Sequence, residues 1–419
     1  MLKEEQLKKN LEEAFDRSKG DLGRRLQDIE GSEDANGNKR TYVFPSVEEA
    51  VKILASRKCN IYIGIDPTGP DIHLGHTIPL LFLKQLTKEK LGGHNPVLLV
   101  GDFTARIGDP TGKTTARQPL TDKQIKENEQ NYLSQVCKIL GKKEDSLDVR
   151  HNSKWLAKMT LRDLVDLSSN VTVQQMIQRD MFQERLRNDK PVGVHEFLYP
   201  LMQGYDSVAM EIDGEVGGND QTFNMLVGRD LEKKLLNKDK LVFATQLLVD
   251  TTTGKKMSKS EGGLISLSDT PGDMFGKTMA IPDSFIRGMF KLCTEVSMKW
   301  IDDNDEDMKA RPYDYKKKLA KELVKMYHGE KEAKKAQEEF EKVFSRKKLP
   351  TDIMEWKGDQ ALIVNVLVES GLIISKSEAK RLTDQKAVKV NDQEITDWNY
   401  KLNRGDVIRV GSRKFLKII

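Results

Sequence analysis

The stretch that decides the fold is Asn60-Ile-Tyr-Ile-Gly-Ile-Asp-Pro-Thr-Gly-Pro-Asp-Ile-His-Leu-Gly-His76. It begins with a short β-prone run, turns after Asp66, and leads into a helix that we expect from about His76. A strand, a turn and a helix in this order form the first half of a βαβ unit. In an open parallel sheet, ligands bind beyond the carboxyl ends of the strands, which is where this turn would lie.

The segments that follow repeat the alternation of strand and helix. Pro96–Gly101 is a continuous apolar run of the kind found in buried parallel strands, and 208–216 and 240–249 are further strand candidates. We therefore predict an α/β fold, with a Rossmann-like, doubly wound parallel sheet forming a catalytic domain over residues 41–265.

The remaining segments differ in character from this domain. Residues 1–40 are predicted to be an N-terminal helical extension that ends in a turn-rich surface loop at 29–40. Residues 266–350 are expected to form a helical domain and connector. Two short helices and a turn-rich β-run then predict a small α+β domain over 351–419.

Composition excludes several classes of protein. With 37% hydrophobic and 32% charged residues, the chain of 419 residues suits a globular protein and not a disordered one. We expect no membrane span and no secretory signal, because no long apolar run occurs. The three cysteines form no CxxC pair, which predicts no zinc site and favours a reducing cytoplasm. The net charge of +4 is small, so any basic face for a nucleic acid must be local.

Two motifs carry chemistry that suits phosphate groups. His73 and His76 would share one face at a helix N-terminus, where anions are favoured, although an isolated HxxH is more often incidental. Lys256 and Lys259, in Lys256-Met-Ser-Lys259-Ser, would place two mobile cations on a Gly-rich loop, although a lone KxxK is usually a solvated surface. The occurrence of both motifs in this order makes a polyphosphate site much more specific.

Two further blocks could line a pocket for a small polar molecule. Tyr199, Gln203 and Asp206 fall on one face of a helix whose flanking residues are apolar, so these polar groups would need partners. Asp220 and Gln221 follow a Gly-Gly pair that would permit a close approach of a ligand. The alternatives are a solvated helix face for the first block and a surface loop for the second.

Together, HLGH and KMSKS resemble the two signatures of class I aminoacyl-tRNA synthetases. With the blocks at Tyr62–Asp66, Gly101–Lys113, Tyr199–Asp206 and Gly217–Asn224, the chain resembles bacterial tyrosyl-tRNA synthetases from about Thr41 to its C-terminus. The resemblance implies activation of L-tyrosine with ATP as a substrate, Mg²⁺ bound with the ATP, no permanent cofactor, and transfer of tyrosine to tRNA-Tyr. It also implies a homodimer.

The resemblance implies roles for the residues that would surround tyrosine. The phenolic hydroxyl would be held by Tyr62 and Asp206. The ammonium group would be held by Tyr199, Asp109 and Gln203. Gln221 would lie beside the carboxylate and the forming adenylate.

It implies a second set of roles around ATP. Asp66 would line the pocket near the adenylate, and Asp220 would bind the ribose. The phosphates would be contacted by His73 and His76 with help from Thr68, and Lys256 and Lys259 would close over the pyrophosphate. Room for the nucleotide would come from three glycines, Gly64, Gly75 and Gly218.

The C-terminal segment resembles the S4 RNA-binding fold that ends bacterial tyrosyl enzymes. Lys376, Lys380 and Arg381 cluster near the start of one short helix, and such a cluster suits contact with phosphates of tRNA.

Two alternatives to a tyrosine-activating enzyme stay open. A tryptophan-specific relative would share the core, but Gln203, Asp206 and the S4-like tail are of the tyrosine type. A non-catalytic RNA-binding protein would have lost the ATP signatures, and both signatures are present.

Overall fold

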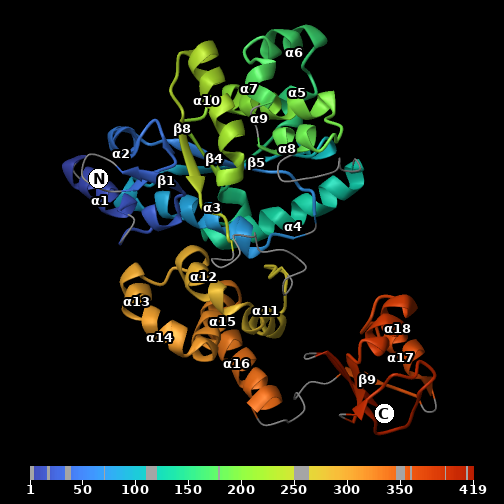
Figure 1. Cartoon of the computed structure of the whole chain (residues 1–419). Helices are drawn as coiled ribbons and strands as arrows, with labels where there is room; N and C mark the ends of the chain where they lie inside the picture. The colour runs from blue at the N-terminus through green and yellow to red at the C-terminus, as the bar shows by residue number, and fades with distance from the viewer. Residues whose placement is uncertain are drawn as a thin grey trace. The chain divides into compact units, whose positions relative to one another are not determined.

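The computed structural model describes most of the chain, in residues 4–16, 19–33, 39–69, 71–109, 120–177, 180–249, 264–345, 354–358, 361–391, 393–411 and 414–419 (Figure 1). The chain divides into two compact units. One comprises residues 1–268 and 281–319, and the other comprises residues 269–280 and 320–419. The domain limits expected from the sequence, after residues 40, 265 and 350, stay predictions.

A six-stranded sheet forms the centre of the first unit, in the order β3 (Val43–Phe44), β8 (Leu241–Thr245), β7 (Gly214–Gly218), β4 (Asn60–Ile65), β5 (Asn95–Val100), β6 (Asp148–His151). β3 pairs antiparallel with β8, and the other pairings are parallel. From β4 the chain proceeds to β5 and β6 on one side, and later adds β7 and β8 on the other. The strand order therefore reverses between β4 and β7, which is the topological switch point of a doubly wound sheet.

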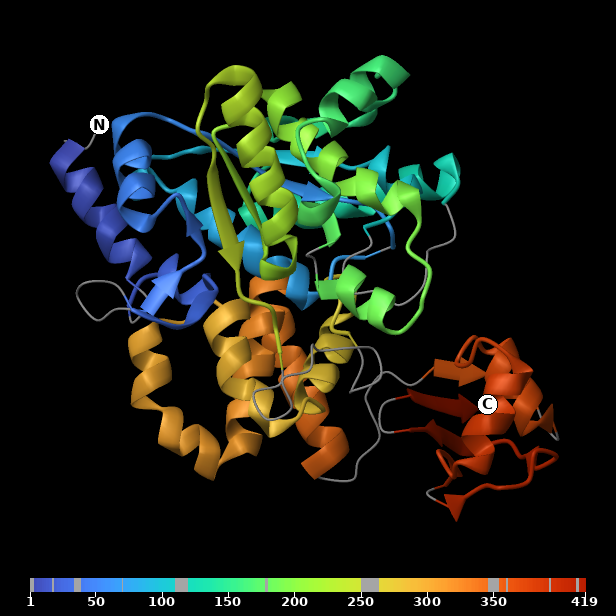
Figure 2. The same cartoon turned by 45° about the horizontal axis from the view of Figure 1, so that its top comes forward.

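Helices cover both faces of this sheet (Figure 1, Figure 2). On one face, Phe82 of α3 (Leu74–Leu86) packs against Phe243 of β8 with ring centroids 5.1 Å apart. On the other, Met225 of α10 (Thr222–Leu236) packs against Val242 and Ala244 of the same strand. α9 (Val194–Met210) lies against α10. The alternation of β8 side chains between two covered faces explains why every residue of this strand is buried.

The predicted fold class is confirmed by this architecture. β4 and β5 lie where the sequence indicates, and α3 begins at Leu74, close to the expected start at His76. Two strand bounds differ. The segment 208–216 continues α9 as far as Met210 before β7 begins, and 240–249 contains β8 only as far as Thr245.

The N-terminal segment packs closely against the rest of the first unit. Phe15, at the end of α1 (Glu4–Phe15), stacks on Phe243 with ring centroids 6.1 Å apart. Fully buried Arg24 donates to the carbonyl oxygens of Phe290 and Thr294, each at 2.9 Å. The segment 29–40, predicted to be a surface loop, contributes to a pair of antiparallel strands, β1 (Asp28–Glu33) and β2 (Lys39–Thr41).

The other helices of the first unit are α2 (Val47–Ser56), α4 (Asp122–Leu140), α5 (Ser153–Leu156), α6 (Leu161–Ser168), α7 (Val173–Ile177), α8 (Asp180–Arg187), α12 (Ile286–Cys293), α13 (Met298–Asp303) and α14 (Asp305–Ala310). Residues of α15 (Pro312–His328) belong to both units.

In the second unit, α11 (Pro271–Met279) packs on α16 (Glu330–Ser345), with the rings of Phe275 and Phe340 5.3 Å apart. A five-stranded sheet follows in the order β12 (Gln393–Glu394), β11 (Val388–Val390), β14 (Val407–Val410), β15 (Lys414–Ile418), β9 (Met354–Trp356). A smaller pair joins β10 (Ala361–Leu362) to β13 (Lys401–Leu402). α17 (Ile363–Glu369) and α18 (Lys376–Asp384) share an apolar core with these strands. No helix in the described ranges is long and apolar enough to span a lipid bilayer.

Candidate active site

A cavity of about 480 Å³ opens at the carboxyl ends of β4 and β7, within the range of roughly 300–1,000 Å³ that is usual for small-molecule sites. The residues that follow successive strands reach it: Asp66 after β4, Gly101 after β5, Asn152 after β6 and Gln246 after β8. The switch point of the sheet therefore creates the cavity, as expected for an open α/β sheet.

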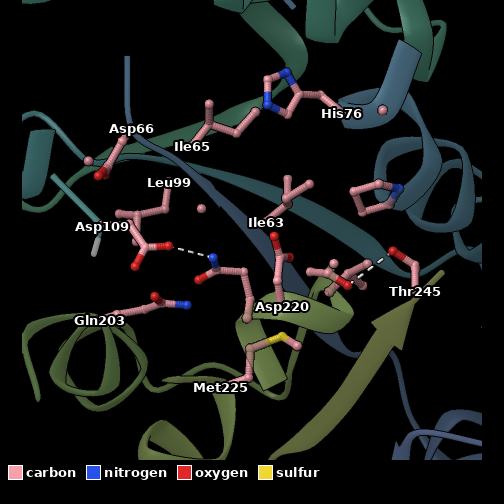
Figure 3. A pocket seen from close by; sticks show the side chains of 18 of the residues that line it. Ile63, Ile65, Asp66, His76, Leu99, Asp109, Gln203, Asp220, Met225 and Thr245 are labelled. Carbon is pink, nitrogen blue, oxygen red and sulfur yellow. Dashed lines mark hydrogen bonds between the residues drawn. The ribbon is translucent and has the colours of Figure 1, made fainter. Parts of the chain in front are cut away.

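Fourteen of the residues predicted for tyrosine and ATP line this one cavity: Tyr62, Gly64, Asp66, Thr68, His73, Gly75, His76, Asp109, Tyr199, Gln203, Asp206, Gly218, Asp220 and Gln221. Figure 3 shows Asp66, His76, Asp109, Gln203 and Asp220 around it. Lys256 and Lys259 lie outside the described residues. Lys376, Lys380 and Arg381 are far along the chain, in α18 of the second unit. The structure brings the fourteen residues together, and the individual roles stay predictions.

The two histidines are built into the N-terminus of α3. The Gly75 amide donates to His73 Nδ1 at 3.1 Å, and the His73 amide donates to His76 Nδ1 at 3.5 Å. Both Nδ1 atoms therefore accept, and in the neutral rings each Nε2 carries the proton. Desolvation by the surrounding protein, and then the neighbouring His73 ring, lower the pKa of His76, although its side chain keeps contact with solvent at the cavity. The His76 ring is therefore neutral near pH 7, and both rings line the cavity at the start of the helix.

One end of the cavity is organised around Asp66. The Tyr199 hydroxyl donates to Asp66 Oδ2 and the Thr104 hydroxyl donates to Asp66 Oδ1, both at 2.7 Å. Burial, followed by the charges of Asp66 and Asp109, raises the pKa of Tyr199 well above its usual value. Tyr199 therefore stays protonated, and its oxygen keeps lone pairs that can accept a hydrogen bond from a ligand. A Cβ at Gly101 would lie 2.0 Å from Asp66 Oδ1, so only glycine leaves room for this carboxylate.

A chain of hydrogen bonds runs along the cavity wall. Gln221 Nε2 donates to Asp109 Oδ2 at 2.6 Å (Figure 3). Asn224 Nδ2 donates both to Gln221 Oε1, at 3.1 Å, and to Gln203 Oε1, at 2.9 Å. Asn224 is fully buried and helps to orient both glutamine amides. The wall therefore offers oriented oxygen acceptors near Asp109, which is what an ammonium group requires.

A buried carboxylate lies at another end of the cavity. Asp206, only 2% exposed, accepts from Trp155 Nε1 at 2.7 Å and from Asn152 Nδ2 at 3.2 Å. Burial raises the pKa of Asp206 well above its usual value, while these two donors act in the opposite direction. Tyr62, fully buried in β4, has its pKa raised by burial, and its hydroxyl lies 3.1 Å from Ser207 Oγ. An acceptor and a hydroxyl at this depth suit a ligand that carries a hydroxyl of its own.

Of the three glycines predicted to make room for a nucleotide, Gly218 is the most constrained. A Cβ there would lie 2.6 Å from Asp220 Oδ1 and 3.1 Å from Leu247 Cδ2. At Gly75 a Cβ would lie 3.0 Å from the His73 ring, whereas at Gly64 it would make ordinary contacts of 3.7 Å or more. A side chain at Gly218 would therefore require Asp220 and Leu247 to shift, whereas Gly64 lines the cavity and has no such close neighbour.

Several residues of the site were missed from the sequence. Thr104, Asn152 and Trp155 hold Asp66 and Asp206, and all three lie in the loops or helices that follow strands β5 and β6. Their position after predicted strands could have identified them as site candidates, because polar residues after parallel strands converge at one edge of the sheet. Glu215 and Lys240 were also missed, and their pairing could not be read from the chain because they meet only through the packing of β7, β8 and α9.

The α18 side chains are a separate feature of the second unit. Ser375 caps this helix by accepting from the Glu378 amide at 3.3 Å, and Lys376, Lys380 and Arg381 are exposed. Lys380 Nζ lies 4.7 Å from the centroid of the Trp398 ring, which is 40% exposed. Exposed cations beside an exposed aromatic ring are typical of surfaces that bind nucleic acid.

An open parallel sheet with a polar cavity at its switch point, and a helix N-terminus facing into that cavity, defines a nucleotide-binding enzyme of the α/β class. The chain belongs to the family described as tRNA synthetases class I (W and Y), whose model matches residues 54–345. An S4 domain matches residues 363–408, as the sequence predicts.

Among relatives of known name, the tyrosine–tRNA ligase of Carboxydothermus hydrogenoformans is 42% identical over 387 residues, covering 89% of this chain and 93% of the relative. The tyrosine–tRNA ligase of Thermotoga maritima is 42% identical over 389 residues, covering 91% of this chain and 96% of the relative. The expected likeness to bacterial tyrosyl-tRNA synthetases is confirmed.

Solved structures agree on the fold. A C-terminally truncated mitochondrial tyrosyl-tRNA synthetase of Aspergillus nidulans matches with a TM-score of 0.61 and 22% identity, covering 81% of this chain and 99% of that chain. The tyrosyl-tRNA synthetase of Archaeoglobus fulgidus, solved with L-tyrosine, matches with a TM-score of 0.56 and 21% identity, covering 79% and 99%. At these identities the likeness supports the architecture alone.

Proposed function

We propose that this chain is a tyrosine–tRNA ligase, which activates L-tyrosine with ATP and transfers it to the 3′-terminal adenosine of tRNA-Tyr. The observation that carries the proposal is the close relationship to enzymes of that name over about nine-tenths of the chain. The cavity supports it, because one pocket contains a buried acceptor for a phenol, acceptors for an ammonium group and histidine donors for phosphates.

Tyrosine would lie between the two ends of the cavity. Its phenolic hydroxyl would donate to Asp206 and form a hydrogen bond with the Tyr62 hydroxyl. Its ammonium would be held by Asp109, Tyr199 and Gln203, with Gln221 beside its carboxylate. The support is that Asp206 is a buried acceptor and that the Asp109 end is lined with oriented oxygen atoms.

ATP would lie across the start of α3. The His73 and His76 Nε2–H groups would donate to its phosphates, with Thr68 nearby, and Asp220 would bind the ribose where Gly218 lets the backbone approach. Asp66 would line the adenylate, and Gly64 and Gly75 would leave space for the nucleotide. Lys256 and Lys259, outside the described residues, would close over the pyrophosphate. We propose that Mg²⁺ accompanies the ATP phosphates and helps to neutralise their charge.

The activation step needs no general base. The tyrosine carboxylate is already ionised at neutral pH and attacks the α-phosphorus of ATP. The new oxygen–phosphorus bond gives tyrosyl-adenylate, and the bond to the β-phosphate breaks to release pyrophosphate. A hydroxyl of the 3′-terminal ribose of tRNA then attacks the carbonyl carbon of the adenylate. The new ester bond forms, the bond to the phosphate oxygen of AMP breaks, and the hydroxyl proton is released with AMP. Catalysis therefore reduces to orienting the two substrates and stabilising charge on the phosphates.

The S4 domain would hold tRNA-Tyr, with Lys376, Lys380 and Arg381 contacting phosphates. Their exposure on one helix supports this assignment. Such contacts position the tRNA and do not read its sequence.

The functional molecule would be a homodimer. α6, α7 and the start of α9 expose large apolar side chains, among them Leu161 at 78% and Val194 at 79%. Leu161 and Val165 lie one helical turn apart and present a single apolar face. Exposed apolar groups gathered in one region are typical of a protein interface. The three cysteines are buried thiols, which supports a reducing cytoplasm as the compartment.

Charging of tRNA-Tyr by the full chain and by a chain ended near residue 355 tests this function. The full chain should charge the tRNA. The shortened chain should still form tyrosyl-adenylate but transfer tyrosine poorly, because it lacks the S4 domain. A full chain that forms no tyrosyl-tRNA would refute the proposal. Changing both His73 and His76 to alanine should abolish activation, and His195→Ala, at an exposed histidine outside the cavity, is the control.

A further inference from the structure

A fully buried lysine lies behind the tyrosine-binding wall. Lys240 immediately precedes β8, is 0% exposed, and donates to Glu215 Oε2 at 2.5 Å and to Ser207 Oγ at 2.8 Å. Burying an ammonium group is costly unless it is paired and hydrogen bonded, and an apolar pair of similar volume often stabilises a core at least as well. The contacts of this ion pair indicate a role other than stability.

The surrounding helices make space for this ammonium group. A Cβ on Gly228 of α10 would lie 2.5 Å from Lys240 Nζ and 2.9 Å from Ser207 Oγ. It would also lie 3.3 Å from the Gly204 Cα of α9, so the two helices approach closely at this glycine pair. The absence of a side chain at Gly228 therefore leaves the space through which Lys240 reaches Ser207 of α9.

The pair acts together with Asn224 to determine which atom of Gln203 faces the cavity. Gln203 Nε2 donates to Glu215 Oε1 at 3.0 Å. The carboxylate paired with Lys240 can only accept, so the amide nitrogen of Gln203 must face Glu215 and its Oε1 must face away. Oε1 accepts from Asn224 Nδ2 at 2.9 Å and retains a second lone pair. An ammonium group only donates, so a Gln203 amide turned the other way would oppose it with N–H groups.

The second contact of Lys240 is with Ser207, near the end of the cavity that would hold the phenol of tyrosine. Ser207 Oγ accepts from Lys240, and it also lies 3.1 Å from the Tyr62 hydroxyl. One buried cation is therefore connected, through one intervening side chain each, to Gln203 and to Tyr62. Neither connecting residue, Glu215 or Ser207, was predicted from the sequence to take part in the site.

We propose that Lys240 and Glu215 are positioning residues of tyrosine recognition: the buried ion pair holds the Gln203 amide with its oxygen toward the ammonium group of the amino acid. The inference rests on the proposed function, since it assumes tyrosine as the ligand of this wall. The pair would thereby contribute to selectivity for ligands that carry an amino group. A purely structural ion pair would not affect that selectivity.

The test compares ligands with and without the amino group in the full-length protein. Inhibition constants for tyramine, which keeps the ammonium, and for 3-(4-hydroxyphenyl)propionate, which lacks it, are measured in tyrosine-dependent pyrophosphate exchange. The variant is Lys240→Met with Glu215→Leu, which removes both charges together. The preference for tyramine over the propionate should fall roughly tenfold or more, the size of one hydrogen bond to a charged group.

Two further variants distinguish the proposed role from a general loss of stability. Arg185→Met with Glu196→Gln removes another buried ion pair that involves α9, at 2.7 Å, and should leave the preference unchanged. Glu215→Gln alone, which keeps the volume and permits either amide orientation, should lower the preference even if the double variant does not fold. An unchanged preference, or an equal weakening of both inhibitors, would overturn the inference. Absence of tyrosine-dependent exchange in the unmodified protein would instead refute the proposed function.

Discussion

Asp206 is the residue on which discrimination between tyrosine and phenylalanine should depend. Its carboxylate is buried and already accepts from Trp155 and Asn152, so a ligand hydroxyl would complete its hydrogen bonding. A pocket that hydrogen bonds a substrate hydroxyl rejects the analogue that lacks it by ~10⁴–10⁵-fold, as is established for tyrosine-activating enzymes. The acceptor, and not the size of the pocket, would carry the specificity.

Asp206→Asn should therefore reduce this specificity. An asparagine has one acceptor oxygen in place of two, and Trp155 and Asn152 would compete for it. We expect the ratio of kcat/KM for tyrosine over phenylalanine, measured by pyrophosphate exchange, to fall by roughly 10²-fold or more. A variant that retains the parental ratio would show that another group recognises the phenol.

Glu232 is a buried carboxylate outside the cavity with an unusual environment. It lies on α10, is fully buried, and neither carboxylate oxygen has a hydrogen-bond partner among the described residues. Burial raises the pKa of Glu232 from 4.5 to about 7, with Lys240 acting in the opposite direction. Because the folded protein holds this proton more tightly than the unfolded chain, stability falls as the pH rises from about 4.5, and the full cost is present above about 7.

Glu232→Gln should remove this cost. The variant's gain in free energy of unfolding over the parent should be about 1 kcal/mol at pH 5 and about 3 kcal/mol at pH 8, as the pKa difference implies. Urea unfolding at the two pH values measures the effect. Glu339→Gln, an isosteric change on α16 in the second unit at a glutamate with no resolved pKa shift, is the control. An advantage of Glu232→Gln that is equal at both pH values would contradict the titration of this group.

At the scale of elements, α3 shows how a short segment builds the proposed phosphate site. His73 and His76 serve as capping groups of the helix and as donors to the cavity, because capping occupies Nδ1 of each ring. The sequence predicted this strand, turn and helix because each part has a local signal: a β-prone run, a Pro- and Gly-rich turn, and an apolar helix.

Some elements and contacts could not be predicted from the sequence. The segment 208–216 was predicted to be a strand, yet Val208 and Met210 continue α9, because a short apolar run does not distinguish a buried helix from a buried strand. The motif blocks identified the residues that line the cavity. The groups that hold those residues, such as Asn224, Glu215 and Lys240, depend on how α9, α10 and two strands pack together, and the chain carries no local signal of that packing.

α18 leads to a prediction about tRNA binding. Replacing Lys376, Lys380 and Arg381 together with alanine should weaken tRNA binding and leave adenylate formation unchanged. Because each lost phosphate contact removes about 0.7–0.9 from the slope of log Kd against log salt, the slope should fall by roughly 2. Filter binding at several salt concentrations measures it. Alanine at Lys331, Lys334 and Lys335 of α16 is a control with the same loss of charge. An unchanged slope in the α18 variant would exclude these residues from the tRNA interface.

At the scale of the whole molecule, assembly should follow from the exposed apolar side chains of α6. Sedimentation of the parent chain should give twice the mass of 47.7 kDa. Leu161→Lys with Val165→Lys should shift it toward the monomer, because charges would be buried in the interface. Leu235→Lys, at a similarly exposed leucine on α10, should leave the mass unchanged. A parent chain that sediments only as a monomer would refute the dimer.

The proposed function depends on which amino acid the cavity accepts. The most direct measurement is ATP–pyrophosphate exchange by the full chain with tyrosine, tryptophan and phenylalanine, each supplied alone. The arrangement of Tyr62, Gln203 and Asp206 predicts rapid exchange with tyrosine and at most trace exchange with the other two. Exchange supported by tryptophan and not by tyrosine would contradict the account.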